Sequence, residues 1–420
     1  MRHLLTILLA STGLWGTTAV LAADRGLTRG SAASGALGAA ETEAAEPKRL
    51  IVAFRPGVGE AAREGALEGL GLKEVEELGA FNAVVAEASE GKFRLSAMRI
   101  MSDPSVLYAE EDVRVNWLQN SAVGFHQAPM PEFSQVMSAL PKFEVKGKTE
   151  GEVPWGIARV NAEKAWPRTQ GERAKVAVVD TGIDFTHPDL AANYAGGVNF
   201  VDGKKPPMDD NSHGSHVAGT IAGVKDGKGV VGVAPKARLY AVKVLDAEGG
   251  GNLTDIIRGL IWCGRNGMHV ANYSLGAPVN SVFMRLAVSY AKMKGVAVIA
   301  AAGNSGGSVS YPAAYEDAIA VAASDSKDRI ADFSSRGPQV DFIAPGVDVL
   351  SSVPGGKYDS YSGTSMAAPH LSGLAALAVS LGASGPEGVR AALKKAAAPV
   401  GLAKEEEGNG LVDAGRLSAR

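Results

Sequence analysis

The chain has 420 residues, a length that allows more than one domain and a sizeable buried core. Hydrophobic residues make up 46% of the sequence and charged residues 21%, which is typical of a globular protein, and the formal net charge is −3. Because the sequence has no Lys/Arg-rich block interleaved with aromatic residues, its composition argues against nucleic acid as a partner.

The first segment predicts an exported precursor. Residues 1–23 begin with the basic Arg2, continue apolar and end in small residues, which is the layout of a secretory signal peptide cleaved near Ala22 or Ala23. The alternative is a membrane anchor, but Ser and Thr interrupt the apolar run, so we expect no membrane attachment after signal removal. Residues 24–47 are rich in Ala, Gly, Ser and Thr and are expected to form a flexible spacer.

Residues 48–118 predict a small α+β domain. Its elements are, in order, a strand at 50–54, a helix at 60–70, a strand at 81–86, a helix at 90–101 and a strand that opens at 106–108. This order is typical of a β-α-β-β-α-β-like unit. Residues 119–150 contain several prolines and few periodic apolar positions, so they are predicted to be a linker.

Residues 151–420 predict a larger domain of the α/β class. Its strand candidates are 175–179, 239–244, 269–272, 296–300 and 318–321, and helical patterns lie between them. Near-continuous runs of Val, Ile and Ala indicate strands buried on both faces, which favours a doubly wound, mostly parallel sheet. The single cysteine, Cys263, excludes an intrachain disulfide and is expected to be a buried small hydrophobic residue.

Polar motifs occur where such a sheet binds its ligands, just after strands or at helix starts. Asp180 ends a strand, and taken alone its Asp-Thr-Gly motif is a weak signal, because Asp-x-Gly after a strand more commonly serves only as a turn. His213 opens an apolar helical stretch, where one ring nitrogen can face a cleft while the other meets a carboxylate, as a general base requires. The alternatives are a capping histidine or half of a zinc site with His216, but no His-Glu-x-x-His motif is present.

A serine and an asparagine extend this set. Ser365 follows a Gly-rich turn and opens a helix at about 365–381, a position where serine is most often only an N-cap. A helix N-terminus also offers backbone N–H groups to an oxyanion, beside a hydroxyl that a nearby imidazole can deprotonate. Asn304 follows an apolar strand and can donate a hydrogen bond to that oxyanion, although asparagine in a Gly-rich turn is usually structural.

Taken together, the motifs resemble the subtilisin family (subtilases). They are Asp-Thr-Gly at 180–182, His-Gly-x-His-Val-Ala-Gly-Thr at 213–220 and Gly-Thr-Ser-Met-Ala-x-Pro-His at 363–370, in this order. The resemblance covers residues 151–420 and implies a serine endopeptidase that hydrolyses polypeptides through an acyl-enzyme. It implies that Asp180 orients His213 and that His213 takes the proton of Ser365. Asn304 and the Ser365 backbone N–H would form the oxyanion hole.

The resemblance also implies a cleft in which the substrate is held as an added β-strand. Its two walls would be Gly249, Gly250 and Gly251 on one side and Ser274, Leu275 and Gly276 on the other. The primary specificity pocket would be walled by the second segment and by Ala301, Ala302 and Gly303, with Ser305 and Ser310 near its base. Because no fixed charge is expected there, large uncharged side chains are the expected preference.

A structural Ca²⁺ ion is a further implication of the family. Its ligands would be Asp189, Val224, Asp226, Lys228 and Val230, from one aspartate and the loop 224–230. Carboxylates and backbone carbonyls are the oxygen ligands that Ca²⁺ prefers. One family ligand, a glutamine near the mature N-terminus, aligns with Gly151 and is missing, so a turn without an ion remains the alternative.

Residues 48–118 resemble the inhibitory propeptide of the same family, most clearly at 105–112. This implies an intramolecular inhibitor, a first self-cleavage close to Leu118 and a mature N-terminus between there and Glu152. The expected product is a monomeric enzyme, secreted to an extracellular or periplasmic location. The alternatives are a catalytically silent subtilase, a processing protease for one partner, and an α/β-hydrolase esterase. The esterase is disfavoured because Gly-x-Ser-x-Gly does not surround Ser365.

Overall fold

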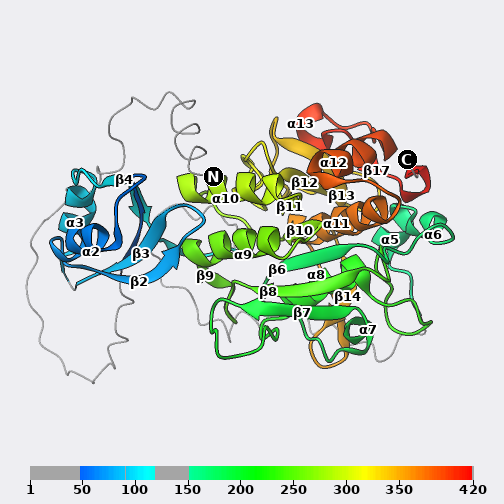
Figure 1. The fold of residues 1–420 in the computed structure, drawn as a ribbon. Helices are drawn as coiled ribbons and strands as arrows, with labels where there is room; N and C mark the ends of the chain where they lie inside the picture. Colours follow the sequence, from blue (N-terminus) through cyan, green and yellow to red (C-terminus); the bar gives the residue numbers. More distant parts are fainter. Residues whose placement is uncertain (1–47, 90, 119–150, 419–420) are drawn as a thin grey trace, which may run out of the picture. The chain divides into compact units, whose positions relative to one another are not determined.

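The structure is a computed structural model that describes residues 48–89, 91–118 and 151–418 (Figure 1). The chain divides into two compact units, the first ending at Asp112 and the second beginning at Val113. The predicted signal peptide, spacer and linker lie outside the described residues. Among the described residues, no single helix is long and apolar enough to cross a membrane. One pair of consecutive helices, Thr364–Ser380 and Gly385–Ala396, has the length and composition to do so together, but the two are bent by 107° relative to each other.

The first unit is a four-stranded antiparallel sheet with two helices against one face (Figure 1). Its elements are β1 (Arg49–Phe54), α2 (Glu60–Glu68), β2 (Leu72–Leu78), β3 (Ala83–Ala88), α3 (Phe93–Ile100) and β4 (Val106–Glu111), with strand order β2-β3-β1-β4. Alternate side chains of β1 and β3, such as Val52 and Val84, form a core with Leu67 of α2 and Ile100 of α3. Alternation on the strands and one apolar face on each helix therefore produce the predicted α+β unit.

Two details of this unit differ from the pattern in the sequence. The strand expected at 81–86 begins at residue 83, because Asn82 has a positive φ of 54° and its amide donates to the Phe54 carbonyl oxygen. β2 was not located from the sequence, because only its two terminal leucines are buried and the residues between them are mostly charged. A strand of this kind has no apolar face for periodicity to detect.

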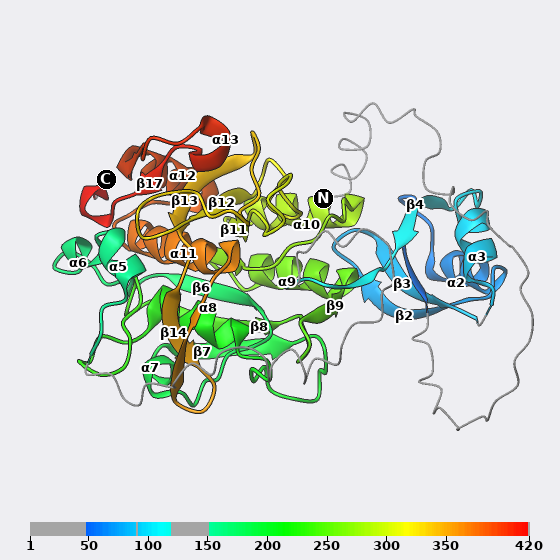
Figure 2. The same ribbon diagram turned by 180° about the vertical axis from the view of Figure 1, so that it is seen from behind.

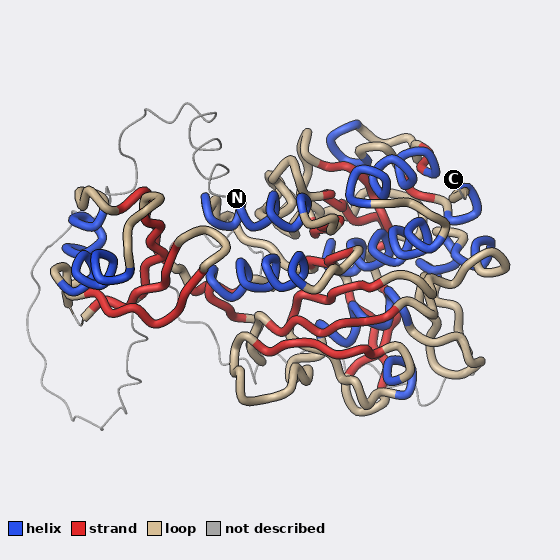
Figure 3. The backbone as a smooth tube through the Cα atoms, in the orientation of Figure 1, coloured by secondary structure: helices blue, strands red, loops and turns tan. Residues whose placement is uncertain are grey.

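The second unit contains a nine-stranded sheet whose interior strands are parallel, which confirms the predicted α/β class (Figures 1 and 3). In spatial order its strands are β16 (Ala397–Ala398), β17 (Leu411–Val412), β13 (Val340–Pro345), β12 (Ile319–Ser324), β11 (Ala297–Ala301), β10 (Val270–Tyr273), β6 (Lys175–Asp180), β8 (Arg238–Lys243) and β7 (Tyr194–Asn199). Only β16 and β17 pair antiparallel. The central strands are buried along their whole length, as their runs of Val, Ile and Ala require.

Helices pack on both faces of this sheet (Figures 1 and 2). α9 (Leu253–Arg265) and α10 (Val282–Met293) cover one face, and α8 (His213–Ala222) and α11 (Thr364–Ser380) cover the other. Cys263 of α9 is buried, as expected, and burial raises the pKa of its thiol. The other helices are α5 (Trp155–Arg159), α6 (Ala162–Ala165), α7 (Pro188–Ala191), α12 (Gly385–Ala396), α13 (Lys404–Glu407) and η1 (Ala414–Arg416). Two short antiparallel pairs lie outside the large sheet: β14 (Val349–Val353) with β15 (Lys357–Tyr361), and β5 (Arg114–Asn116) with β9 (Gly250–Asn252).

The parallel arrangement places the carboxyl ends of the strands at one edge of the sheet. β6 ends at Asp180, β10 ends one residue before Ser274, and β11 ends shortly before Asn304. These three strands lie within a run of neighbours, β11-β10-β6. Groups from three distant parts of the sequence therefore meet at this edge.

Candidate active site

A buried carboxylate and an imidazole are joined at the carboxyl edge of the sheet. The side chain of Asp180 is fully buried at the end of β6, where the Thr181 backbone N–H donates to its Oδ1 at 2.7 Å. His213, the first residue of α8, has Nδ1 at 2.8 Å from Oδ1 and 3.0 Å from Oδ2 of Asp180. Because an ionised carboxylate only accepts hydrogen bonds, Nδ1 of the neutral ring carries the proton and Nε2 is left without one.

A second buried carboxylate, Asp209, holds the start of α8. Its Oδ1 accepts from the Thr181 hydroxyl and from the backbone N–H groups of Asn211 and Ser212, at 2.8–3.0 Å. Its Oδ2 accepts from both the N–H and the hydroxyl of Ser215. Asp209 therefore ties the loop after β6 to the first turn of the helix that carries the imidazole. No motif in the sequence analysis pointed to this residue.

These two carboxylates set the protonation of the imidazole. Burial by itself lowers the pKa of His213, but the charge and hydrogen bond of Asp180, with a further contribution from the charge of Asp209, outweigh it and raise the pKa above its ordinary value. Two other histidines differ. Burial lowers the pKa of His216 to about 3 and that of His370 to about 4, so both are neutral. Their rings pack inside the protein and have no proton-transfer role.

A buried lysine lies beneath the same edge. Lys243, at the end of β8, donates from Nζ to the carbonyl oxygens of Thr181 and Leu245 and to Oδ1 of Asp210, at 2.6–2.9 Å. Its side chain is only 4% exposed. The three acceptors satisfy the ammonium, and Lys243 thereby ties Thr181, the residue after Asp180, to Asp210 and Leu245. The sequence shows Lys243 at the end of an apolar strand, but this position was not singled out as a candidate.

The nucleophile candidate lies in the first turn of α11. Ser365 is 8% exposed, and its Oγ donates to the Ser274 carbonyl oxygen at 3.0 Å, while the Ser274 hydroxyl donates back to the Ser365 carbonyl oxygen at 2.7 Å. The start of α11 adjoins that of α8, because the Tyr361 hydroxyl bonds to the Ser212 hydroxyl at 2.8 Å and its ring stacks on His216. A rotation about the Cα–Cβ bond of Ser365 changes which acceptor its hydroxyl faces.

The orientation of the Asn304 amide follows from its partners. Oδ1 of Asn304 accepts from the backbone N–H and from the hydroxyl of Thr364, both at 2.8 Å. A backbone N–H can only donate, so the bonded atom is the amide oxygen and not the nitrogen. The Nδ2 group is therefore available as a donor. Thr364, to which the Asn304 side chain is bonded, is the residue before Ser365. Thr364 in turn accepts from the Gly303 N–H at 3.1 Å.

The two predicted cleft segments lie on either side of a short stretch of the chain, residues 114–117, which we call the tail. β5 (Arg114–Asn116) pairs antiparallel with β9 (Gly250–Asn252). On that side the Trp117 N–H donates to the Gly249 carbonyl oxygen, and on the other side the Gly276 N–H donates to the Trp117 carbonyl oxygen, both at 3.0 Å. Trp117 is fully buried and its Nε1 donates to the Gly251 carbonyl oxygen. Residues 114–117 thus lie as an added strand between these segments.

Two serine hydroxyls lie close to Gly303, one of the residues expected in the primary pocket. This glycine has a positive φ of 113°, and a Cβ at this position would lie 2.6 Å from the Ser310 hydroxyl and 2.9 Å from that of Ser335. Ser305 lies 3.3 Å from Ser335, hydroxyl to hydroxyl. Ala301, Ala302, Ser274 and Leu275, which were also expected around the pocket, are buried. The surroundings of Gly303 are hydroxyls rather than charged groups.

Two of the predicted calcium ligands, Val224 and Val230, are hydrogen-bonded to a third, Asp189. Its buried carboxylate accepts from the Val230 N–H at 2.9 Å, and its carbonyl oxygen accepts from the Val224 N–H. A Cβ at Gly151 would lie 2.7 Å from the Gly227 backbone, so no side chain fits there and the ligand absent from the sequence has no room. The described residues contain no cluster of three or more His, Cys, Asp or Glu side chains that could hold a metal. Carboxylates and carbonyls of this loop still form a donor set that suits Ca²⁺.

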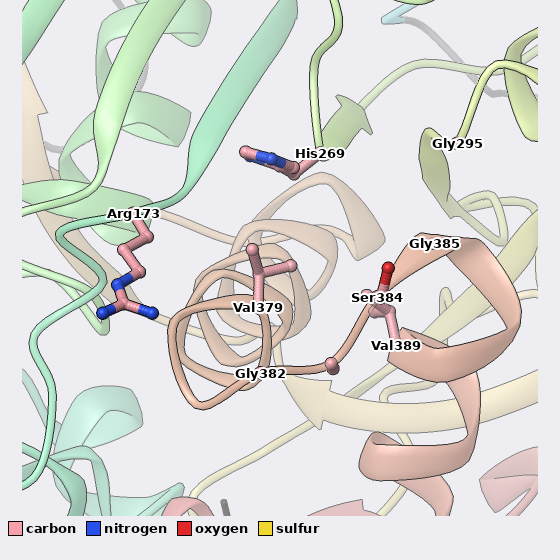
Figure 4. Close-up of a pocket in the computed structure, with 9 residues that line it drawn as sticks. Arg173, His269, Gly295, Val379, Gly382, Ser384, Gly385 and Val389 are labelled. Carbon is pink, nitrogen blue, oxygen red and sulfur yellow. The ribbon is translucent and has the colours of Figure 1, made fainter. Parts of the chain in front are cut away.

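A separate pocket lies at the opposite edge of the sheet (Figure 4). Arg173 and His269 line it just before the amino ends of β6 and β10, together with Val379, Ser384 and Val389 from α11, the following turn and α12. Because the catalytic candidates follow the carboxyl ends of these strands, this pocket is distinct from them.

Comparison with known proteins gives consistent matches. Residues 171–411 match the Subtilase family. Subtilisin Savinase of Lederbergia lenta is 55% identical over 227 residues, which are 54% of this chain and 83% of that protein. M-protease of Shouchella clausii (strain KSM-K16) is 48% identical over 277 residues, 66% of this chain and 64% of that protein, so the chain spans just under two thirds of this relative. Subtilisin E of Bacillus subtilis (strain 168) is 40% identical over 343 residues, 79% of this chain and 80% of that protein.

The extent of these matches decides the family. The family match covers more than half of the chain and includes the elements that carry Asp180, His213, Asn304 and Ser365. The alignment with subtilisin E covers more of the chain than residues 113–420 contain, so it reaches into the first unit. The resemblance seen in the sequence is confirmed: the chain belongs to the subtilase family, a family of serine endopeptidases.

Proposed function

We propose that this chain is an active serine endopeptidase in which Ser365 is the nucleophile, His213 the general base and Asp180 the group that orients it. The observation that carries the proposal is the double contact of His213 Nδ1 with a fully buried carboxylate, which leaves Nε2 unprotonated at the edge where Ser365 lies. In a catalytically inactive protein that kept only the fold, a buried carboxylate directed at an imidazole would serve no catalytic purpose, so its presence here favours an active enzyme.

The proposed reaction runs through an acyl-enzyme. His213 Nε2 takes the proton as Ser365 Oγ bonds to the carbonyl carbon of the scissile peptide, and the carbonyl oxygen becomes an oxyanion. Nδ2 of Asn304 and the Ser365 N–H at the start of α11 donate to it. The C–N bond then breaks, and His213 gives its proton to the leaving amine. Water, deprotonated by the same Nε2, hydrolyses the ester and restores the Ser365 hydroxyl.

Labelling with a fluorophosphonate tests this activity. The secreted, processed protein is expected to be labelled at Ser365, and a Ser365→Ala variant is expected to remain unlabelled. If the folded surroundings of Ser365 make its hydroxyl reactive, protein that is unfolded before labelling should take no label. A folded protein that takes no label and cleaves no peptide would favour the silent alternative.

The proposed precursor is a zymogen that inhibits itself. The segment 114–117 lies between both cleft walls as a substrate would, which supports a tail that blocks the cleft. We expect the Ser365→Ala precursor, expressed without other proteases, to keep residues 24–118 attached after signal removal, while the unaltered chain loses them. Mass spectrometry of the secreted product checks this. Identical trimming of both proteins would exclude self-processing.

A pH profile checks the proposed role of His213. The neutral ring is the base, so kcat/KM is expected to fall as the pH drops through the pKa of His213. Because Asp180 and Asp209 raise that pKa against the effect of burial, the midpoint is expected above about 6.5, the ordinary value for histidine. Asp209→Asn removes one of the two charges, so its midpoint is expected at a lower pH than that of the unaltered enzyme. An equal or higher midpoint would contradict this account.

We also propose that Ca²⁺ binds at the loop 224–230, through the carboxylates of Asp189 and Asp226 and the carbonyls of Val224, Lys228 and Val230. A bound Ca²⁺ would neutralise a buried carboxylate and tie the loop to α7. At a concentration of 100 times Kd, binding stabilises by about 2.7 kcal/mol, which raises Tm by roughly 5–10 °C in a domain of this size. Calorimetry with Ca²⁺ and with a chelator measures the shift.

A matched pair of variants assigns the calcium effect to this loop. Asp189→Asn is expected to abolish the Ca²⁺-dependent shift in Tm. Asp202→Asn is expected to keep it, because among the described residues the partly exposed Asp202 carboxylate bonds only to the nearby Lys204 and Lys205. Equal shifts in both variants would place the ion elsewhere.

A further inference from the structure

The tail that lies in the cleft carries a charged side chain that meets a charged partner there. Arg114 lies opposite Asn252 in the β5–β9 ladder, and its guanidinium forms an ion pair with the carboxylate of Asp246, in the loop between β8 and β9. The Arg114 side chain is 38% exposed and that of Asp246 16%. Among the described residues, Arg114 is the only cationic side chain paired with Asp246.

The carboxylate of Asp246 is held in place before any peptide arrives. Its Oδ1 accepts from the backbone N–H groups of Glu248 and Gly250, at 3.0 and 2.8 Å. The Asp246 N–H donates to the Gly250 carbonyl oxygen and its own carbonyl oxygen accepts from the Gly249 N–H. These four bonds close a tight turn and leave Oδ2, the oxygen that meets Arg114, directed at the peptide. A fixed carboxylate loses little side-chain entropy when it pairs with a cation.

The turn that holds Asp246 continues into the wall of the cleft. Gly249 accepts from the Trp117 N–H, and the Asn116 amide donates to the Glu248 carbonyl oxygen at 2.7 Å. The backbone bonds fix the register of a bound strand whatever its sequence. In that register the residue three positions before the one in the place of Trp117 always faces Asp246.

We propose that Asp246 is a specificity-determining residue of the peptidase, a subsite that selects an arginine or lysine in the place of Arg114. The proposal rests on the function proposed above, with β9 as the edge that binds substrate. Arginine is expected to be preferred over lysine, because its planar guanidinium matches a carboxylate better than an ammonium does. A glutamate in that place is disfavoured by like-charge repulsion. This subsite would add selection by charge to the preference for large uncharged side chains that is expected at the primary pocket.

Peptides copied from the tail test the subsite. Fluorescence-quenched peptides of the sequence 110–124 carry Arg, Lys, Gln or Glu at position 114, and kcat/KM is measured with the processed enzyme at low ionic strength. A partly exposed pair of this kind is expected to favour Arg over Gln by about three- to fivefold. The preference is expected to shrink in 0.5 M NaCl because salt screens exposed charges. Mass spectrometry locates the cut, and peptides that are cut slowly are compared as competitive inhibitors.

Variants of the carboxylate separate charge from structure. Asp246→Asn keeps an oxygen that accepts from Glu248 and Gly250, so the turn is retained while the charge is lost. Its Arg/Gln ratio is expected to fall to within twofold of unity, and Asp246→Lys is expected to favour Glu over Arg. Asp202→Asn is the control and should keep the preference. An Arg/Gln ratio that is the same in the unaltered enzyme and in Asp246→Asn overturns the subsite, whereas an unaltered enzyme that cleaves and binds none of the peptides overturns the proposed function instead.

Discussion

Replacing Asp180 with Asn is expected to lower kcat by about 10⁴-fold, a loss of the size found for such a change in other serine proteases. The reason lies in which atoms face His213. The Thr181 N–H donates to Oδ1 of Asp180 and would hold the amide oxygen of the new asparagine there. The amide nitrogen then takes the place of Oδ2, 3.0 Å from Nδ1, so the negative charge is lost and a donor faces Nδ1 beside the amide oxygen, which lies at 2.8 Å. The proton of the neutral ring moves to Nε2, which can no longer accept from Ser365.

The measurement for Asp180→Asn is single-turnover hydrolysis of a chromogenic peptide, together with Tm. Asparagine has the shape of aspartate, so the fold is expected to persist, and an unchanged Tm confirms that the variant is folded. Asp202→Asn, an equivalent change on the surface, should leave kcat unchanged. A loss of less than tenfold in Asp180→Asn would mean that the carboxylate does not set the tautomer of His213.

Asn304→Ala is expected to lower kcat by about 10²–10³-fold with little change in KM. The amide oxygen of Asn304 is fixed by two donors of Thr364, so its Nδ2 group is already aimed when the oxyanion forms. A donor that needs no reorganisation acts mainly on the transition state, and a loss of this size is what removing one such donor costs in subtilisin. The change therefore falls on kcat rather than on substrate binding.

Two variants of Thr364 serve as controls for Asn304→Ala. Thr364→Ser keeps the hydroxyl that donates to the Asn304 oxygen and accepts from the Gly303 N–H, so most of the activity should remain. Thr364→Val removes it and leaves Asn304 held by one bond, which should give a smaller loss of kcat than Asn304→Ala. Equal effects on kcat and KM in Asn304→Ala would indicate a structural role for the amide.

Several elements were predictable because local pattern alone determines them. Buried parallel strands such as β6 and β11 are continuous apolar runs, and the polar residues that follow them, Asp180 and Asn304, stand out for that reason. By contrast β2 and β7 are partly exposed and contain charged or glycine residues, so periodicity did not reveal them. The hairpin of β14 and β15, which covers His216, was not located either.

The sequence by itself determined the family, the α/β class and the identity of the candidate triad, because each of these is written in a short motif or a run of apolar residues. Tertiary structure alone decided which partners surround them. The five hydrogen bonds to Asp209, the contact of Lys243 with Asp210 and the pairing of Arg114 with Asp246 join residues through turns and across chain separations that no periodicity encodes. A single polar residue in a loop carries no pattern, and its role follows only when the chain folds and brings its partner within hydrogen-bond distance.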